Sequence, residues 1–412
     1  MTHDRSSTSG ARGWDVEAIV VGGGPAGSTV SAQLANAGHR VLLLDKASFP
    51  RHKACSEYIN PAGAMLLDEM GMTGEIMAAG AHRMNAMLVH APGGQHFVAN
   101  YAKAGPDRAA LGLSRYRLDH LLIDRARAAG VDVMERAHVR RVIQENGQVV
   151  GVEATINGNR EEIRAGIVIG ADGHKSVVSR ELGQDTTPRW PHKTGLVAHY
   201  RGVRDLDRFG EMHIGQRAYA GFAPLEDGLT NVAVVADVRA VEGRTGSIDE
   251  FFMASLRSMP AVARKLDGAE RVGTIRGVGS MARRARHTTG DGYLLVGDAA
   301  QFLDPFTGEG IYEAMRGAHL AAPVVSAALR SGGATAEALR PYRAARRQTF
   351  MAKRDVSWIV QGFINTPALM NYVTDRLARR EELGLTLSGV LGNFRPATQA
   401  LSPVFLARLL RP

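Results

Sequence analysis

Three glycines with a fixed spacing are the residues of this chain whose chemistry is easiest to infer. Gly22, Gly24 and Gly27 come directly after an apolar stretch that begins at Val16, and an Ala-rich stretch follows them. The first glycine of such a motif permits a tight turn, the second lets the backbone approach a pyrophosphate, and the third allows close helix–strand packing. Asp45 stands 18 residues after Gly27, where its carboxylate can accept hydrogen bonds from an adenosine ribose. These residues predict a dinucleotide-binding site at a helix N-terminus, where free N–H groups face the phosphate charge.

Distant segments contain short glycine- and aspartate-rich motifs of a related kind. Residues 297–298 read Gly-Asp, and the run 305–311 contains a proline followed by Gly-Glu-Gly-Ile. A Gly-Ala-Asp-Gly motif occupies residues 170–173, and Arg115 with Asp119 stands at the entry of a predicted helix. In this combination the motifs resemble the fingerprints of the p-hydroxybenzoate hydroxylase-like superfamily of FAD enzymes.

The resemblance implies a role for each motif. Asp298 would hydrogen-bond the ribityl chain, and the backbone at 308–311 would lie by the flavin pyrimidine, whose negative charge in the reduced state is stabilised by free N–H groups at a helix start. Arg115 would contact the FAD, and the backbone at Val139 would lie near the adenine. The resemblance and the glycine motif together predict an FAD site formed by Gly22, Gly24, Pro25, Ala26, Gly27, Asp45, Lys46, Lys53, Cys55, Ser56, Arg115, Val139, Asp172, Asp298, Pro305, Gly308, Gly310 and Ile311.

A narrower resemblance, to the geranylgeranyl reductase-like branch, rests on two segments and spans roughly residues 15 to 350. Residues 49–55 read FPRHKAC and residues 219–224 read YAGFAP. Reductases of this branch usually have Cys-Gly after the lysine and a tryptophan before the later proline, whereas this chain has Cys55-Ser56 and Phe222. The departures favour a different reaction on the same cofactor.

Three hypotheses for the function follow. The leading one is a monooxygenase that hydroxylates or epoxidises a hydrophobic aromatic, polyketide or isoprenoid-like metabolite. The alternative is reduction of a carbon–carbon double bond of the geranylgeranyl reductase type, and a hypothesis of another class is a non-catalytic flavoprotein that binds or escorts a ligand. For the enzymes, NADPH or NADH would bind transiently as reductant, or a separate reductase would supply electrons, because the sequence contains no second complete nucleotide-binding unit.

The candidate catalytic and substrate residues come from the same two segments and their immediate neighbours. Cys55, Glu57 and Tyr219 are candidates for a catalytic acid or base. Cys55 is equally consistent with a small buried hydrophobe. Tyr219, Phe222 and Leu225 are candidates for an apolar substrate pocket, although such a stripe is more often simply core.

Strands and helices that alternate along the chain would position these residues, which is typical of an α/β fold. The pattern from Val16 to Leu44 is strand, glycine turn, helix and strand, and a helix at about 117–129 follows. Alternating stretches between about 193 and 237 predict an antiparallel sheet with one solvated face. A buried strand at 293–297 and a long helix after Gly310 return the chain to the cofactor domain.

We therefore predict a Rossmann-like FAD-binding domain of the p-hydroxybenzoate hydroxylase type, an inserted antiparallel-sheet substrate domain and a helical C-terminus. The predicted ranges are a disordered tail at 1–14, a discontinuous FAD-binding domain at 15–82, 115–185 and 281–350, a substrate domain at 83–114 and 186–280, and a helical cap at 351–412.

Composition limits the other classes of function. Cys55 is the only cysteine, which excludes an intramolecular disulfide and argues against a cysteine-based metal site, and we expect no metal. The net charge is +9, but the basic residues are scattered without interleaved aromatics, which argues against nucleic acid as a partner.

The first 14 residues contain no apolar signal-like run and no stretch is apolar enough to span a membrane, so we expect a cytoplasmic protein. The amphipathic C-terminal stretch suggests peripheral membrane contact, with a packed terminal helix as the alternative.

Overall fold

The computed structural model describes residues 15–104, 108–188, 190, 192–206, 208–279, 281–302 and 305–411. The tail predicted at residues 1–14 lies outside the described residues. Among the described residues, none of the helices combines the length and the apolarity that crossing a bilayer requires.

A parallel sheet brings the N-terminal glycine turn next to a segment from late in the chain. β1 (Val16–Val21) and β2 (Val41–Leu44) are parallel and are connected by α1 (Pro25–Asn36). β1 also pairs in parallel with β11 (Asn159–Gly170), which pairs in parallel with β20 (Tyr293–Leu295). All residues of β2 and β20 are buried, as expected where both faces of a parallel sheet are covered. Because the carboxyl ends of these strands share one edge, the turns after β1, β11 and β20 lie close together.

The same sheet contains four further strands. β8 (Asp132–Met134) pairs in parallel with β2, and β19 (Thr289–Gly290) pairs antiparallel with β20. β9 (Ala137–Glu145) and β10 (Gln148–Ile156) form an antiparallel extension of β11. The helix predicted at about 117–129 is α4 (Arg115–Ala128), which begins two residues earlier because Ser114 caps it by accepting a hydrogen bond from the Arg117 N–H. Arg115 is therefore the first residue of the helix.

A second, seven-stranded sheet contains segments from two parts of the chain. Its order is β17 (Glu270–Val278), β13 (Lys193–Arg201), β16 (Leu229–Asp237), β15 (Ala218–Pro224), β14 (Phe209–Ile214), β5 (Ala86–His90) and β6 (His96–Asn100). The strands are antiparallel except for the parallel pair of β14 and β5. The prediction of one solvated face was wrong, because residues 230–236 of β16 are all buried. One face packs on α7 (Ile248–Arg257) and α8 (Pro260–Lys265), and the other faces the C-terminal helices.

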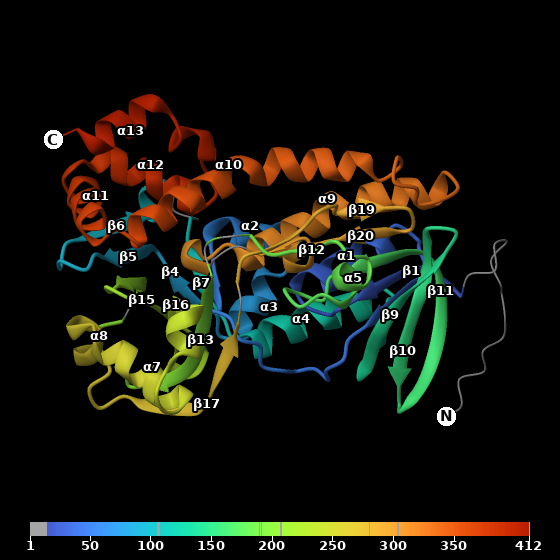
Figure 1. Cartoon of the computed structure of the whole chain (residues 1–412), viewed down its shortest axis with the longest axis horizontal. Coiled ribbons are helices and arrows are strands. Elements are labelled where there is room, and N and C mark those ends of the chain that lie inside the picture. Colours follow the sequence, from blue (N-terminus) through green and yellow to red (C-terminus); the bar gives the residue numbers. More distant parts are fainter. Residues whose placement is uncertain are drawn as a thin grey trace.

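Helices from the last quarter of the chain cover both sheets (Figure 1). α9 (Gly310–Arg330) packs on α1 through a face rich in alanine, and α10 (Arg340–Ile364) runs along the top of the molecule from the first sheet to the second. The predicted helical C-terminus is formed by α11 (Pro367–Arg379), α12 (Glu381–Leu391) and α13 (Pro403–Leu410). In α13, Phe405 is buried, whereas the side chain of Val404 is exposed.

Short elements connect these layers. They are β3 (Tyr58–Ile59), α2 (Pro61–Glu69), α3 (Thr73–Ala78), β4 (His82–Met84), β7 (Ala110–Gly112), α5 (Val177–Glu181), β12 (Asp185–Thr186), α6 (Val238–Glu242), β18 (Arg283–Ala285), β21 (Gln301–Phe302) and the 3₁₀ turns η1 (Ala102–Ala104), η2 (Glu226–Gly228), η3 (Gly297–Ala299), η4 (Pro305–Thr307) and η5 (Ala397–Gln399).

Candidate active site

One cavity of about 450 Å³ gathers residues from segments that lie far apart in the sequence. Its lining includes the turn after β1, the end of β2, the segment 51–56, the start of α4, the turn after β11 and the start of α9. Every predicted cofactor residue except Gly27 and Pro305 lines this cavity. Gly27 is buried in α1, and the side chain of Pro305, the first residue of η4, lies outside the described part of the structure.

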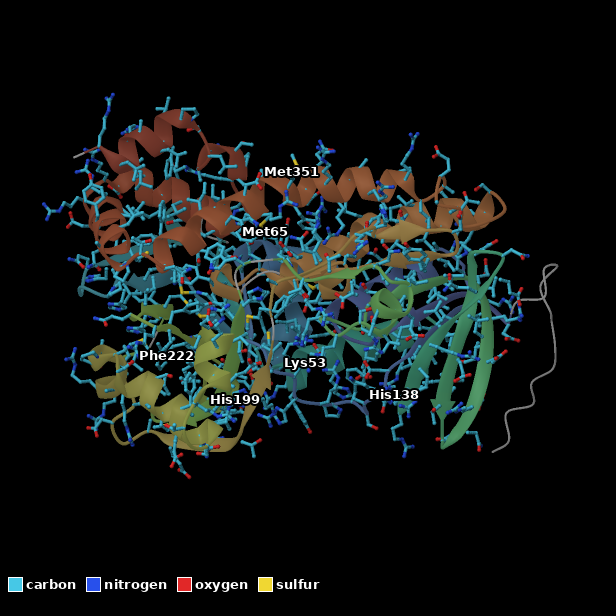
Figure 2. The ribbon with its side chains drawn as sticks, viewed as in Figure 1. Lys53, Met65, His138, His199, Phe222 and Met351 are labelled. Atoms are coloured by element: carbon cyan, nitrogen blue, oxygen red, sulfur yellow. The ribbon has the colours of Figure 1, made fainter. Side chains whose placement is uncertain are left out.

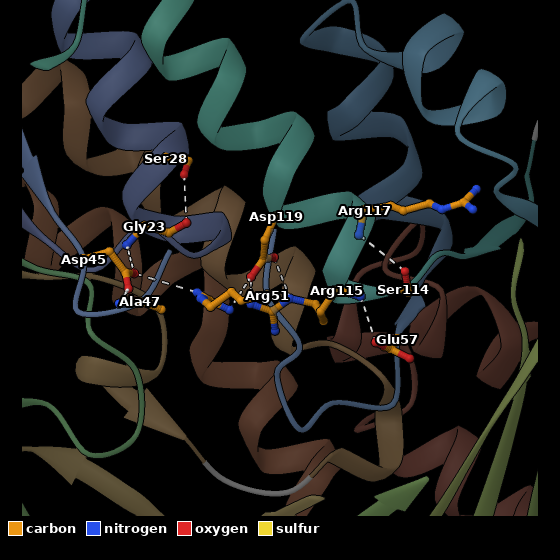
Figure 3. Close-up of polar contacts among 10 residues, drawn as sticks. All are labelled: Gly23, Ser28, Asp45, Ala47, Arg51, Glu57, Ser114, Arg115, Arg117 and Asp119. Atoms are coloured by element: carbon orange, nitrogen blue, oxygen red, sulfur yellow. Dashed lines mark hydrogen bonds and ion pairs between the residues drawn. The ribbon is translucent and has the colours of Figure 1, made fainter. Parts of the chain in front are cut away.

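The glycines of the first turn are required by close backbone contacts. Gly22 has φ +101°, and a Cβ at this position would lie 2.6 Å from the Ala171 carbonyl oxygen. A Cβ on Gly27 would lie 1.7 Å from the Gly22 carbonyl oxygen, so this glycine lets α1 begin against the turn. Asp45 holds the turn from β2, because its Oδ2 accepts a hydrogen bond of 2.7 Å from the Gly23 N–H (Figure 3). The backbone contacts and the Asp45 hydrogen bond thus fix the conformation of the turn, and the N-terminal end of α1 lies at the cavity.

A buried ion-pair network lies beside this turn (Figure 3). Arg115 forms a bidentate pair with Asp119, with distances of 2.6 Å from Nε to Oδ1 and 2.8 Å from Nη2 to Oδ2. Arg51 Nη1 donates to the same Asp119 Oδ2 at 2.9 Å. Because Arg115 is only 8% exposed, it is a fixed cation of the cavity wall and not a solvated helix arginine.

Deeper in the cavity lie charged side chains whose hydrogen bonds to the described residues are incomplete. Burial raises the pKa of Asp298 to about 6, although the cations Lys53 and Arg115 oppose this shift. Burial and the neighbouring Arg115 lower the pKa of Lys53. Asp172 Oδ1 is buried and has no hydrogen-bond partner among the described residues. A buried acceptor of this kind is satisfied by the hydroxyls of a bound ligand, so the residues fit a polyhydroxylated, phosphorylated group.

The start of α9 completes the cavity on its far side. Gly308 has φ +65°, and a Cβ there would lie 2.5 Å from the ring of Tyr58. No side chain of a described residue caps the helix, so its first N–H groups are available to a ligand beside the lining residues Gly310 and Ile311. Glu309, also in the lining, pairs with the buried Lys353 of α10.

Comparison with known proteins gives the cofactor that this cavity suits. A model of the FAD binding domain family matches residues 15–357. This chain belongs to the FAD binding domain family. It is an FAD-dependent oxidoreductase of the p-hydroxybenzoate hydroxylase-like superfamily, geranylgeranyl reductase-like branch, as the sequence predicts.

Individual relatives of this FAD-dependent protein differ in their reactions. It is 30% identical over 336 residues to digeranylgeranylglycerophospholipid reductase 2 of Methanopyrus kandleri, covering 80% of this chain and 81% of the relative. The flavin-dependent brominase Bmp2 has a similar fold, with a TM-score of 0.81, 21% identity and coverage of 92% and 93% of the two chains. A geranylgeranyl bacteriochlorophyll reductase-like protein of Thermoplasma acidophilum gives a TM-score of 0.78, 23% identity and coverage of 89% and 92%. The two structures share the fold with this chain, and the relatives include both reductases and halogenases.

The FAD cavity extends into an apolar chamber against the seven-stranded sheet. Gly195 and Val197 of β13, Ala233 and Val235 of β16, and Val278 of β17 line it. Sequence reasoning missed these residues, because it weighed the aromatic side chains of β15. The alternation of side chains along β13 and β16 was the signal that could have found them. In each strand two alternate residues line the chamber, and the residues between them pack with α7 and α8.

The candidate substrate residues Tyr219, Phe222 and Leu225 are not among the residues that line the cavity, and their contact with substrate stays a prediction. Phe222 is 2% exposed and packs with Phe252 of α7, on the outer face of the sheet. Tyr219 lies on the opposite face, because successive side chains of a strand alternate, and its ring contacts Phe306 edge-to-face. Leu225 is buried just after β15, where its N–H bonds the Leu229 carbonyl. Figure 2 labels Phe222 on the second sheet and Lys53, which is one of the residues that line the cavity.

Of the candidate catalytic residues, only Cys55 lines the cavity. Burial raises the pKa of its thiol, so the thiol stays protonated. Glu57 is 1% exposed and is occupied by three donors: Oε1 accepts from the Arg115 N–H at 2.8 Å, and Oε2 lies 2.6 Å from His199 Nε2 and 2.9 Å from Asn231 Nδ2. Glu57 is therefore a positioning residue that fixes the start of α4.

A cluster of metal-ligand types lies outside the cavity. His90, Glu211 and His213 bring their ligand atoms within 4.8 Å of one another. Lys265 Nζ lies 3.0 Å from Glu211 Oε1, and His213 Nε2 lies 2.7 Å from Glu211 Oε2. The Lys265 ammonium group thus supplies a positive charge to this cluster. That the protein binds no metal stays a prediction.

Proposed function

We propose that the protein reduces a carbon–carbon double bond of a hydrophobic, isoprenoid-like substrate, with FAD held by the cavity-lining residues of the first sheet. When bound, FAD supplies the reducing equivalents, which it receives from NADPH, NADH or a separate reductase. The apolar chamber of β13, β16 and β17 would hold the substrate chain. The chamber residues of these strands are apolar and offer no ionised side chain.

The observation that carries the proposal is the position of the Cys55 thiol, which lines the same cavity as the apolar chamber residues. Reduction of an alkene requires a proton donor beside the reacting carbon. Cys55 can supply this proton, since burial raises the pKa of its thiol although the neighbouring Arg115 opposes the shift. The Glu57 N–H donates to Sγ at 3.3 Å, which orients the side chain. The similarity to the Methanopyrus reductase supports the same reaction.

The Phe222 departure from the reductase pattern is not an argument against reduction in this structure. Phe222 stands where a tryptophan is usual, but its side chain packs on α7 and does not border the cavity. Ser56 is the departure that does line the cavity. Monooxygenation is the second candidate, because an apolar chamber beside a flavin site also suits oxygen transfer to a hydrophobic substrate.

Isotope labelling distinguishes the two reactions. The FAD-loaded protein, NADPH and geranylgeraniol are incubated in D₂O under ¹⁸O₂, and the product is analysed by mass spectrometry. Reduction predicts a product with at least one solvent deuterium for each double bond saturated and no ¹⁸O. An ¹⁸O-containing product would overturn the proposal in favour of monooxygenation.

Cys55 variants test the donor separately. Cys55→Ser keeps an exchangeable proton and should retain part of the turnover, whereas Cys55→Ala should reduce kcat at unchanged FAD content. Equal kcat values for Cys55→Ala and the parent would exclude Cys55 as the donor and leave the reaction itself to the labelling experiment.

A further inference from the structure

A second cavity, of about 370 Å³, lies between α10 and the segment 284–288. Met351 of α10, labelled in Figure 2, belongs to its lining. The lining contains six arginines, Arg284, Arg286, Arg343, Arg346, Arg347 and Arg354, and no Asp or Glu among its described residues. We propose that this arginine cavity binds the phosphate groups of a phosphorylated ligand whose other end reaches the FAD cavity.

The charge of the arginine cavity is only weakly compensated. Guanidinium groups stay protonated at every physiological pH, so the six side chains create a strong positive potential in one hollow. Asp355 Oδ1 approaches Arg354 Nη2 to 3.6 Å, and Glu313 interacts with Arg346 from the side of the FAD cavity. Burial and the neighbouring Glu309 raise the pKa of Glu313 to about 8, so Glu313 carries little negative charge at neutral pH.

The backbone that presents the arginines is fixed before any ligand binds. The N–H of Arg286 donates to the Gln184 carbonyl at 2.8 Å, and the N–H of His287 donates to Gln184 Oε1 at 3.1 Å. On α10, the guanidinium carbon of Arg346 lies 5.3 Å from the centre of the Phe350 ring. A site of this kind loses less conformational freedom when it binds a ligand.

The number of arginines points to phosphate groups as the ligand. A guanidinium matches two oxygens of a phosphate or carboxylate in a bidentate arrangement. One carboxylate would leave most of the arginines without a counter-charge, whereas a diphosphate or a pair of phosphoesters offers several oxygens and more than one negative charge. The arginine cavity therefore fits a diphosphate or a phosphoester group best.

The two cavities are adjacent. Gln301 and Arg354 line both of them, so a ligand held by phosphate groups in the arginine cavity can extend past these residues to the flavin. Two ligands have this chemistry: a phosphorylated hydrophobic substrate and a nicotinamide dinucleotide. The phosphate site does not depend on which reaction the FAD cavity catalyses.

Calorimetric titration of the FAD-loaded protein with inorganic pyrophosphate at low ionic strength tests the site. The double variant Arg343→Gln/Arg347→Gln removes two arginines that line the arginine cavity and not the FAD cavity. Each charged hydrogen-bond partner contributes at least about tenfold to binding, so the double variant should bind pyrophosphate about a hundredfold more weakly. The matched control is Arg340→Gln/Arg379→Gln, which removes two exposed arginines of α10 and α11 and should bind as the parent does.

Three results would overturn the proposal. They are no binding of pyrophosphate by the parent, equal binding by the parent and the double variant, and an equal loss in the control. The FAD content and the melting temperature of each variant show that a loss of binding is not a loss of fold. Product analysis of the proposed reaction is a separate measurement, so either conclusion can fail alone.

Two pairs of probes identify the source of the phosphate. If a phosphorylated substrate is the ligand, the double variant weakens the binding of farnesyl diphosphate and leaves that of farnesol unchanged. If the reductant is the ligand, the double variant raises KM for both NADPH and NADH, because each carries a diphosphate, and leaves the binding of farnesyl diphosphate unchanged. Should pyrophosphate binding depend on the arginines while neither pair responds, the connection between the two cavities is overturned.

Discussion

Lys353 of α10 forms a buried ion pair with Glu309, the residue that precedes α9 at the FAD cavity. Lys353 Nζ also donates to the Val390 carbonyl, and Asn393 Nδ2 donates to Glu309 Oε1 at 3.1 Å. The C-terminal helices thus fix the start of α9, which the family resemblance places by the flavin pyrimidine. Both side chains are 6% exposed, so the loss of one partner leaves a charge without compensation.

Lys353→Met should destabilise the protein by about 3–5 kcal/mol, because an unpaired buried carboxylate remains. The midpoint potential of bound FAD should also fall, because a cation near the start of α9 is lost. Thermal unfolding and a redox titration of the FAD-loaded variant measure the two effects. The double variant Lys353→Met/Glu309→Gln should recover most of the stability, and a double variant as unstable as Lys353→Met would contradict this account of the pair.

Gly27→Ala should abolish FAD retention, because its Cβ would lie 1.7 Å from the Gly22 carbonyl oxygen and would force α1 away from the turn. Flavin absorbance of the purified variant and its melting temperature check the prediction. Gly74→Ala in α3 is the matched control, since nothing lies within 4 Å of its Cβ, and it should retain FAD. Equal FAD content in Gly27→Ala and the parent would refute the role of this glycine.

Glu57→Ala should lower the melting temperature and weaken FAD binding, because the Arg115 N–H, His199 and Asn231 lose a shared acceptor. An unsatisfied buried donor costs about 1–3 kcal/mol. Glu57→Gln keeps part of the network and should show a smaller effect. A positioning residue predicts an unchanged pH–rate profile in Glu57→Gln, so a lost pKa in that profile with normal stability would show direct catalysis instead.

Glu313 should make the protein less stable as the pH rises from about 5 to 8. Burial and Glu309 raise the pKa of Glu313 to about 8 from an ordinary value of 4.5, so the folded state holds its proton after the unfolded state has lost it. The full contribution is present below pH 4.5 and is lost at up to about 1.4 kcal/mol per pH unit. Glu313→Gln removes this dependence, and melting temperatures from pH 5 to 8 should fall less in the variant. Parallel curves for variant and parent would be inconsistent with the buried carboxyl.

Local motifs explain why the cofactor cavity could be predicted from the sequence. The glycine turn, Asp45, Asp172 and Asp298 are specified by a few neighbouring residues at strand ends, and a parallel sheet brings such ends together. The fold class follows from the same alternation of strands and helices. These parts depend little on the packing of distant elements.

The chamber and the arginine cavity depend on distant packing, and their residues could not be assigned in this way. The face of a strand that turns to a cavity is set by the layers on either side, so Phe222 was predicted to face a substrate and Val235 was not named. The arginines at 343, 347 and 354 recur at helical spacing, but only the contact of α10 with the segment 284–288 places them opposite Arg284 and Arg286.

The most direct test of the proposed reaction is to reduce the purified FAD-loaded protein with NADPH without oxygen, and then to add geranylgeraniol, still without oxygen, while the flavin absorbance is recorded. The account predicts that the flavin is reoxidised by the alkene and that the product is heavier by two hydrogens per double bond. Flavin that stays reduced until air is admitted, and then yields an oxygen-containing product, would contradict it.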